Sequence, residues 1–207
     1  MSTENVIIFG CGAAGSNVFL NLIHVHPALN YTLVDFDKVE ARNILPGTQP
    51  YSKADLNRPK VQALQMIARQ RRDIRAVAVN QKMCSVYNVR ELIKSPQTIL
   101  IDAFDNAPSR NLLFQCDKHP APTGKESILH IGFSAQMVGE IVWNESYEEM
   151  SESKADARID VCELHLALPF INVLTGMAAK VVSDFILHGR KQSLGFQFNE
   201  MKVTKFE

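Results

Sequence analysis

A glycine-rich turn between an apolar strand and a helix is the feature that most constrains the fold of this chain. Residues 6–15 read Val-Ile-Ile-Phe-Gly-Cys-Gly-Ala-Ala-Gly. In this order, Gly10 permits a sharp turn, Gly12 leaves the backbone open to a phosphate, and Gly15 lets the helix lie close to the strand. The segment therefore predicts a strand, a phosphate-binding turn and the start of a helix.

A carboxylate follows the second expected strand, twenty residues after the last of these glycines. Leu33-Val34-Asp35 ends that strand, and the Asp35 side chain could accept hydrogen bonds from a ribose. The start of the helix, at Ala13 and Ala14, offers N–H groups and a partial positive charge to phosphates. Together these parts predict a nucleotide-binding site. The alternative is a core of the same type whose glycines serve packing only.

The composition fits a single α/β domain over residues 1–207. Lys+Arg and Asp+Glu both number 22, so the zero net charge gives no basis for a nucleic-acid or membrane-surface binder. We expect no membrane span and no signal peptide, and hence a cytoplasmic protein. The cysteines form no C-x-x-C pair, which argues against a zinc site and a disulfide framework. They are Cys11, Cys84, Cys116 and Cys162.

Alternating strands and helices predict a mostly parallel, Rossmann-like sheet with helices on both faces and an antiparallel C-terminal portion. We expect strands at 5–9, 31–35, 76–79, 98–102, 127–133 and 137–143, and an edge strand within 195–206. We expect helices at about 14–24, 59–72, 86–94, 107–117 and 170–187. Asn57 would cap the second helix and Pro59 would be its first residue. Residues 144–160 contain six carboxylates and predict an exposed, mobile acidic loop.

Four polar clusters are expected where strands of such a sheet end. A bound triphosphate needs a cation and a carboxylate for its magnesium in addition to the glycine turn and the ribose acceptor. Lys60 is the candidate cation, with a solvated surface lysine as the alternative. Asp105 is the candidate carboxylate, with an N-cap of the helix from Ala107 as the alternative. The clusters are residues 35–37, Asn43, Lys60 and residues 102–106.

The order of these blocks resembles the ubiquitin-activating-enzyme superfamily, in the form of its small bacterial ThiF, MoeB and HesA-type members. The family pattern is G-x-G-x-x-G, V-D-x-D-x-V-E-x-x-N-L-x-R-Q, G-x-x-K and D-x-x-D-N-x-x-x-R. The second block is the most specific, because simple dehydrogenases do not carry it after the second strand. The resemblance covers about residues 5–190. The matching segments are 10–16, 34–44, 57–61 and 102–110, followed by Cys162 and Pro169 before the long helix.

The resemblance implies an ATP- and Mg²⁺-dependent adenylyltransferase, working as a homodimer, that activates the C-terminal carboxylate of a small ubiquitin-like or sulfur-carrier protein. It implies catalytic roles for Lys60 and Asp105, with Asp105 on the metal. Cys162 would take the acyl group, with a buried structural cysteine as the alternative. Zinc is not expected, because the cysteine pairs common in the family are absent. The implied cofactor-binding residues are Gly10, Gly12, Ala13, Ala14, Gly15, Asp35, Asp37, Asn43, Lys60, Asp105 and Asn106.

Two cations of the family pattern have no counterpart. Pro46 stands where the pattern has an arginine, and the sequence starts too close to its first strand to contain the preceding helix that supplies the other. Arg42, Arg58 or an arginine-supplying partner subunit could compensate. Because these two cations are missing, a second function remains an alternative: a non-catalytic scaffold half or a carrier-binding subunit. A nicotinamide-dependent oxidoreductase is a further alternative, because the glycine turn and Asp35 also suit NAD.

The remaining cysteines are expected to pack inside the protein. Cys11 is expected to be a small packing residue within the glycine turn, and Cys84 and Cys116 are expected in the core. For Cys162, the start of the long helix favours thiolate, whereas the neighbouring carboxylates Asp160 and Glu163 oppose it.

Overall fold

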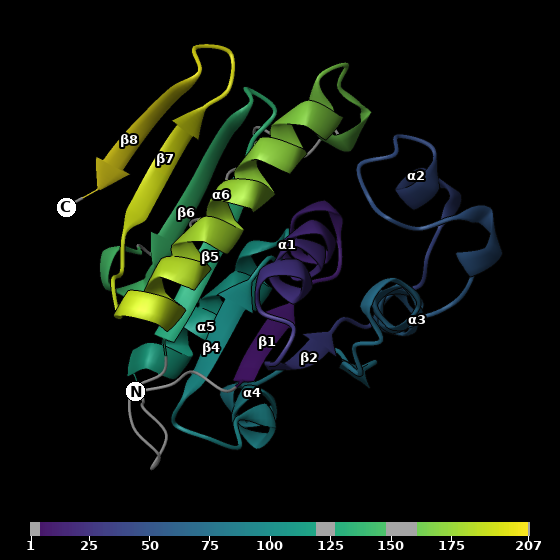
Figure 1. The fold of residues 1–207 in the computed structure, drawn as a ribbon, viewed down its shortest axis with the longest axis horizontal. Helices are drawn as coiled ribbons and strands as arrows, with labels where there is room; N and C mark the ends of the chain where they lie inside the picture. The colour runs from purple at the N-terminus through teal and green to yellow at the C-terminus, as the bar shows by residue number, and fades with distance from the viewer. Residues whose placement is uncertain (1–4, 119–126, 148–160, 207) are drawn as a thin grey trace.

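The computed structural model describes residues 5–118, 127–147 and 161–206, and a single sheet runs through them (Figure 1). Its eight strands have the order β3-β2-β1-β4-β5-β6-β7-β8. Strands β1 to β5 pair in parallel, and β6, β7 and β8 continue the sheet antiparallel. The predicted fold class, mostly parallel with an antiparallel C-terminal portion, is therefore confirmed.

The elements follow the predicted alternation of strand and helix, with small shifts at their ends. The strands are β1 (Asn5–Phe9), β2 (Asn30–Val34), β3 (Val77–Val79), β4 (Thr98–Asp102), β5 (Ser127–Phe133), β6 (Val138–Trp143), β7 (Ser193–Gln197) and β8 (Lys202–Phe206). The helices are α1 (Ala13–Val25), α2 (Ala41–Ile44), α3 (Lys60–Arg72), α4 (Val86–Leu92), α5 (Ala107–Lys118) and α6 (Ala167–His188). Short 3-10 turns lie at Lys53–Asp55, Asn144–Ser146 and Val161–Glu163.

The C-terminal segment forms a hairpin of two strands, where one edge strand was predicted. Met201 has a φ of 49°, and its N–H donates to the Phe198 carbonyl at 3.0 Å, so the chain reverses between β7 and β8. The prediction took Met201 as one of the alternating apolar residues of a single strand. A methionine in the left-handed region is uncommon, and the apolar alternation hid a turn whose common turn-forming residue is Asn199.

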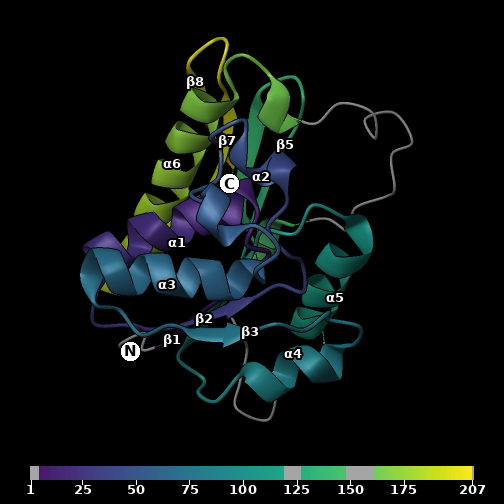
Figure 2. The same ribbon diagram turned by 90° about the vertical axis from the view of Figure 1, so that its right-hand side faces the viewer.

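Helices cover both faces of the parallel half of the sheet (Figures 1 and 2). On one face, α1, α3 and α6 pack around Phe19, Leu64 and Ile171. On the other face, α4 and α5 pack around Val89 and Leu113. Because β1 and β4 are covered on both sides, their sequences are continuous apolar runs.

Helix α6 has the length and composition of a membrane-spanning helix, which the sequence reading did not anticipate. In the structure Ile171, Leu174, Ala178 and Val181 of this helix are buried, and the helix lies along α1. Core packing accounts for the buried apolar residues of this helix. The helix also begins three residues earlier than predicted, so Pro169 lies in its first turn, where an N–H has no partner within the helix.

The start of α3 differs from the predicted cap. Asn57 has a φ of 65°, and its N–H donates to the Val39 carbonyl at 2.9 Å. Pro59 precedes the first helical residue, Lys60, whose N–H donates to the Asp37 carbonyl at 2.9 Å. A pairing between two distant segments has therefore replaced the local cap, and it carries Lys60 to the edge of the sheet beside Asp37.

The predicted acidic loop at 144–160 lies largely outside the described residues, which omit 148–160. Its first part is described: Glu145 and Ser146 are exposed as expected, whereas Asn144 is not. Asn144 is 4% exposed and begins the 3-10 turn after β6. Its side-chain oxygen accepts the Ile128 N–H at 3.4 Å, so this residue belongs to the end of the sheet.

We expect Gly15→Ala to lower the free energy of unfolding by about 2 kcal/mol or more, because an added Cβ would lie 1.9 Å from the Gly10 carbonyl oxygen. Gly176→Ala is the matched control, since a Cβ on this exposed glycine of α6 would meet no atom within 4 Å. In the control, the free energy of unfolding should stay the same or rise by up to about 1 kcal/mol, because alanine favours a helix more than glycine does. Urea unfolding measures both, and equal losses in the two variants would contradict the close helix–strand contact.

Candidate functional site

The glycine turn holds the carboxyl ends of β1, β2 and β4 together. Gly10 has a φ of 86°, and a Cβ there would lie 2.6 Å from the carbonyl oxygen of Ala103. The Gly10 N–H donates to the Val34 carbonyl at 2.9 Å, and the Ala103 N–H donates to the Phe9 carbonyl at 2.8 Å. In an open sheet of this kind, the crevice beside such a central strand is where ligands bind.

The N-terminus of α1 opens into this crevice. The helix begins at Ala13, and no side chain caps it. A Cβ on Gly12 would meet no atom within 4 Å, so the space beside the helix start is free. The first N–H groups of a helix have no partner within it, and they carry the positive end of the helix dipole. This arrangement suits an anion such as a phosphate.

Asp35 braces the glycine turn from the end of β2. Its two carboxylate oxygens accept the N–H groups of Cys11 at 2.7 Å and Asp37 at 2.8 Å. Burial raises the pKa of Asp35, whereas Lys60 and the two N–H donors oppose that rise. Each carboxylate oxygen can accept a second hydrogen bond, so a ribose hydroxyl can still be bound.

Lys60 and Asn43 lie beside Asp35, carried by α3 and α2. The Lys60 ammonium is 3.1 Å from the Asp37 carboxylate, and Lys60 is 7% exposed. The alternative of a solvated surface lysine is therefore wrong. Asn43 is also buried, and its Oδ1 accepts the Glu40 N–H at 2.9 Å. The Nδ2 donor of Asn43 is then the part of this side chain that could meet an anion.

The cap of α5 is Asn106, so the alternative role of Asp105 as that cap is wrong. The Ser109 N–H donates to Asn106 Oδ1 at 3.0 Å, and Asn106 Nδ2 donates to Asp105 Oδ1 at 3.2 Å. The exposed Asp105 carboxylate thus stands just past the end of β4. One such carboxylate fits Mg²⁺ bound to a nucleotide, because Mg²⁺ takes its other ligands from phosphates and water. Among the described residues, no group of three or more His, Cys, Asp or Glu could hold a metal ion without a nucleotide.

A cavity of about 860 Å³ brings these groups together. Gly15 does not line this cavity, and its place is the contact between α1 and the glycine turn. The predicted site residues that do line it are Gly10, Gly12, Ala13, Ala14, Asp35, Asp37, Asn43, Lys60, Asp105, Asn106 and Cys162.

The opposite wall of the cavity consists of residues that the sequence analysis did not select for it. Arg110, His130, Glu140 and Tyr147 come from α5, β5, β6 and the turn after β6. Arg110 was noted only as part of a motif. His130 interrupts the buried apolar run of β5, and a histidine inside such a run is the one signal that could have found this wall.

The four cysteines occupy different environments, and all are free thiols. Cys11 and Cys116 are buried as predicted, and burial raises the pKa of the Cys11 thiol. Cys84 is exposed, so its predicted place in the core is wrong; it lies in the connection between β3 and α4, outside either apolar layer. Cys162 is half-buried, packs against the core beneath α6 and lines the cavity. Its position therefore suits both the structural and the acyl-carrying alternative.

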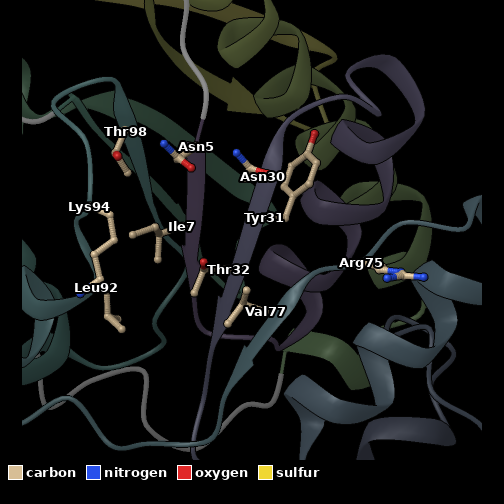
Figure 3. Close-up of a pocket in the computed structure, with 10 residues that line it drawn as sticks. All are labelled: Asn5, Ile7, Asn30, Tyr31, Thr32, Arg75, Val77, Leu92, Lys94 and Thr98. Atoms are coloured by element: carbon tan, nitrogen blue, oxygen red, sulfur yellow. The ribbon is translucent and has the colours of Figure 1, made fainter.

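A second, smaller cavity of about 260 Å³ lies at the opposite edge of the parallel strands (Figure 3). Asn5, Asn30, Val77 and Thr98, at the amino ends of four strands, line it. None of the predicted site residues is among its lining residues. It is therefore separate from the crevice at the carboxyl ends.

Comparisons with known proteins agree with this architecture. The E. coli protein MccB, solved with MccA-N7isoASN, superposes with a TM-score of 0.75 at 16% identity, over 99% of this chain and 64% of MccB. MccB solved with ATP gives a TM-score of 0.73 at 16% identity, over 100% of this chain and 64% of MccB. PaaA gives 0.71 at 16% identity, over 99% of this chain and 72% of PaaA. This chain thus spans about 64% of the length of MccB, and the likeness at this identity shows the fold.

The family comparison covers the whole sequence. Curated proteins give no match. The model of the ThiF family, in contrast, matches residues 1–207. The match includes the glycine turn, Asp35, Lys60 and Asp105, the groups that meet in the large cavity. This chain belongs to the ThiF family.

Proposed function

We propose that this chain is an ATP-dependent adenylyltransferase that activates the C-terminal carboxylate of a small ubiquitin-like or sulfur-carrier protein. The observation that carries the proposal is the single cavity in which the start of α1, Lys60 and Asp105 meet. Each of the three suits a different part of a magnesium–triphosphate. MccB, which has a similar fold, has been solved with ATP and with N-formylated MccA. These structures support the proposal that the substrates are ATP and a polypeptide.

The nucleotide would lie across the carboxyl ends of β2, β1 and β4. Asp35 would accept hydrogen bonds from the ribose, and the open helix start at Gly12 would receive the phosphates. Lys60 and the amide of Asn43 would add donors from the side of α2 and α3. The ammonium of Lys60 already pairs with Asp37 at 3.1 Å, so it is held in place before an anion arrives. Asp105 would hold Mg²⁺, which supplies positive charge to the phosphates when bound.

The chemistry needs alignment and charge neutralisation more than an acid–base pair. A carboxylate oxygen of the carrier attacks the α-phosphorus, the bond to the bridging oxygen of the β-phosphate breaks, and pyrophosphate leaves. A carboxylate at neutral pH has no proton to lose. The residues of this cavity would therefore act by fixing the triphosphate in line with the incoming carboxylate and by stabilising the negative charge.

Arg42 is the candidate for the cation that Pro46 cannot provide. It lies next to Asn43 on α2 and lines the cavity. Its Nε donates to the Glu40 carboxylate at 2.7 Å, and this exposed pair can exchange for a phosphate at little cost. Arg58 has a different environment, 3.4 Å from the Asp55 carboxylate, and does not line the cavity.

The functional unit is proposed to be a dimer, either of two copies or with an arginine-supplying second subunit. The absence of an arginine at Pro46 motivates the second form. If this chain catalyses ATP–pyrophosphate exchange without a partner subunit, the scaffold alternative is excluded. A chain that exchanges only with an arginine-bearing partner supports that alternative. We propose transfer of the acyl group to Cys162 as a later step, because this thiol lines the same cavity.

Lys60→Ala and Asp105→Ala should each lower magnesium-dependent ATP–pyrophosphate exchange by about 100-fold or more, because each removes charge stabilisation of the reacting phosphates. Exchange can be measured with a synthetic peptide ending in Gly-Gly as the carboxylate. Lys180→Ala is the control for Lys60, since this lysine is exposed on α6 and pairs with Asp184. Exchange at the wild-type rate in both cavity variants would refute the assigned site.

Arg42→Ala and Arg58→Ala form a second test within one short segment. The Arg42 variant should raise the KM for ATP by about tenfold or more, because a phosphate loses its cation. The Arg58 variant should stay within about twofold of the wild type, because its partners are Asp55 and Met66. Equal effects in the two variants would show that Arg42 has no special place in nucleotide binding.

Calorimetry can compare how tightly the protein binds ATP with Mg²⁺ and how tightly it binds NAD. We expect heat of binding with ATP and Mg²⁺ and much weaker binding of NAD, because an open helix start flanked by Lys60 and Asp105 suits a triphosphate and its ion. Tighter binding of NAD than of ATP would instead favour the oxidoreductase alternative.

A further inference from the structure

His130, which lines the large cavity, forms a pair with the buried carboxylate of Asp102 behind it. The register of the parallel strands sets Asp102 of β4 directly beside His130 of β5. The two residues are 0% and 1% exposed. His130 Nδ1 lies 2.7 Å from Asp102 Oδ2, which is a strong hydrogen bond between side chains.

The surroundings of Asp102 decide which nitrogen of His130 holds the proton. Asp102 Oδ1 accepts the Phe104 N–H at 3.0 Å, and Arg110 Nη1 lies 3.9 Å from Oδ2. A carboxylate can only accept hydrogen bonds, so the group that meets Oδ2 has to be a donor. His130 Nδ1 is the nitrogen that can donate to this carboxylate, and in the neutral ring this leaves the lone pair on Nε2.

The second nitrogen of His130 lacks a partner. Within the part of the chain that the structure describes, His130 Nε2 is buried and makes no hydrogen bond. His130 is nevertheless among the residues that line the 860 Å³ cavity. The ring cannot turn freely, because Tyr147 stacks on it with centroids 3.7 Å apart and planes within 10°. Buried polar atoms are normally paired, so the lone pair is held ready for a ligand that donates a hydrogen.

The strand order places this lone pair beyond the proposed nucleotide site. Asp35 follows β2, the glycine turn follows β1 and Asp105 follows β4, so the nucleotide residues end at β4. His130 lies on β5, the next strand of the sheet. A lone pair repels phosphate oxygens, which are themselves acceptors, and it suits an N–H or S–H group. The group that enters here is therefore a second reactant.

We propose that His130, oriented by Asp102, is the base that deprotonates the acyl acceptor, an amine or a thiol. This inference rests on the proposed adenylyltransferase function. The acceptor attacks the carbonyl carbon of the acyl-adenylate, an N–C or S–C bond forms, and the C–O bond to AMP breaks with its electron pair leaving on AMP. The acceptor proton passes to His130 Nε2. Asp102 is a positioning residue, because it touches only the imidazole and offsets its positive charge.

The test uses the full chain, N-acetyl-glycylglycyl-adenylate as acyl donor, and two acceptors, glycinamide as the amine and N-acetylcysteamine as the thiol. Because Cys162 lines the same cavity and would also release AMP, transfer is measured as the AMP release in single turnovers that depends on the added acceptor. His130→Gln should slow transfer by about 100-fold or more and Asp102→Asn by about tenfold or more. The arm that shows the larger loss identifies the acceptor class. His188→Gln is the matched control, since His188 is exposed at the end of α6.

The pH profile distinguishes a base from a structural residue. Transfer by the wild type should show a pH inflection that vanishes in His130→Gln, because the variant has no base at this position. Asp102 from β4 contacts His130 directly. The other charged or titratable groups on this side of the cavity are Asp105 before α5, Arg110 from α5, Glu140 from β6, Tyr147 after β6 and Cys162 before α6. Burial raises the pKa of the Tyr147 phenol, so its ionisation lies above the range in which the inflection is expected.

Two further readouts separate the possible failures. If the wild type does not exchange ATP with pyrophosphate, the proposed function falls and this inference falls with it. If exchange occurs but His130→Gln transfers at the wild-type rate, the inference alone is wrong. Should the variant fail to fold, ¹⁵N NMR of wild-type imidazoles decides. A neutral His130 with its proton on Nδ1 supports the proposal, and a proton on Nε2 overturns it.

Discussion

The close approach of β1, α1 and the end of β4 is the constraint on which the rest of the site depends. A side chain at Gly10 would meet the Ala103 carbonyl, and a side chain at Gly15 would meet the Gly10 carbonyl. Only hydrogen atoms fit at these two positions. The approach brings the helix start and Asp105 to the same crevice, and the Cys11 N–H ties that crevice to Asp35.

A second layer of contacts fixes the charged groups around this core. The pairing of residues 57–60 with residues 37–39 sets Lys60 beside Asp37, and the capping box of α2 holds Asn43. Both side chains are buried, so they are ordered before any ligand arrives. Preorganised charges of this kind stabilise a reacting phosphate without reorganisation cost. The opposite wall, with Arg110, His130 and Tyr147, has a different chemistry, because its central group is a lone pair backed by a carboxylate.

The parts of the site that were predicted lie in short, contiguous segments with a fixed local geometry. The glycine turn and Asp35 follow β1 and β2 directly, Asp105 comes three residues after the end of β4, and parallel strands bring their carboxyl ends to one edge. The errors have a different origin. The cap of α3 gave way to tertiary pairing at Asn57, and Asn106 took the capping role assigned as the alternative for Asp105, because both residues could serve and only the geometry chooses.

The sequence by itself determined the fold class, membership of the ThiF family and the residues proposed for the nucleotide-binding half of the cavity, because each depends on local spacing along the chain. Only the tertiary structure revealed the other half. Asp102 and His130 are 28 residues apart, and the register of two parallel strands sets them 2.7 Å from one another. Register and side-chain stacking arise from packing between distant segments, and no periodicity within either segment encodes them.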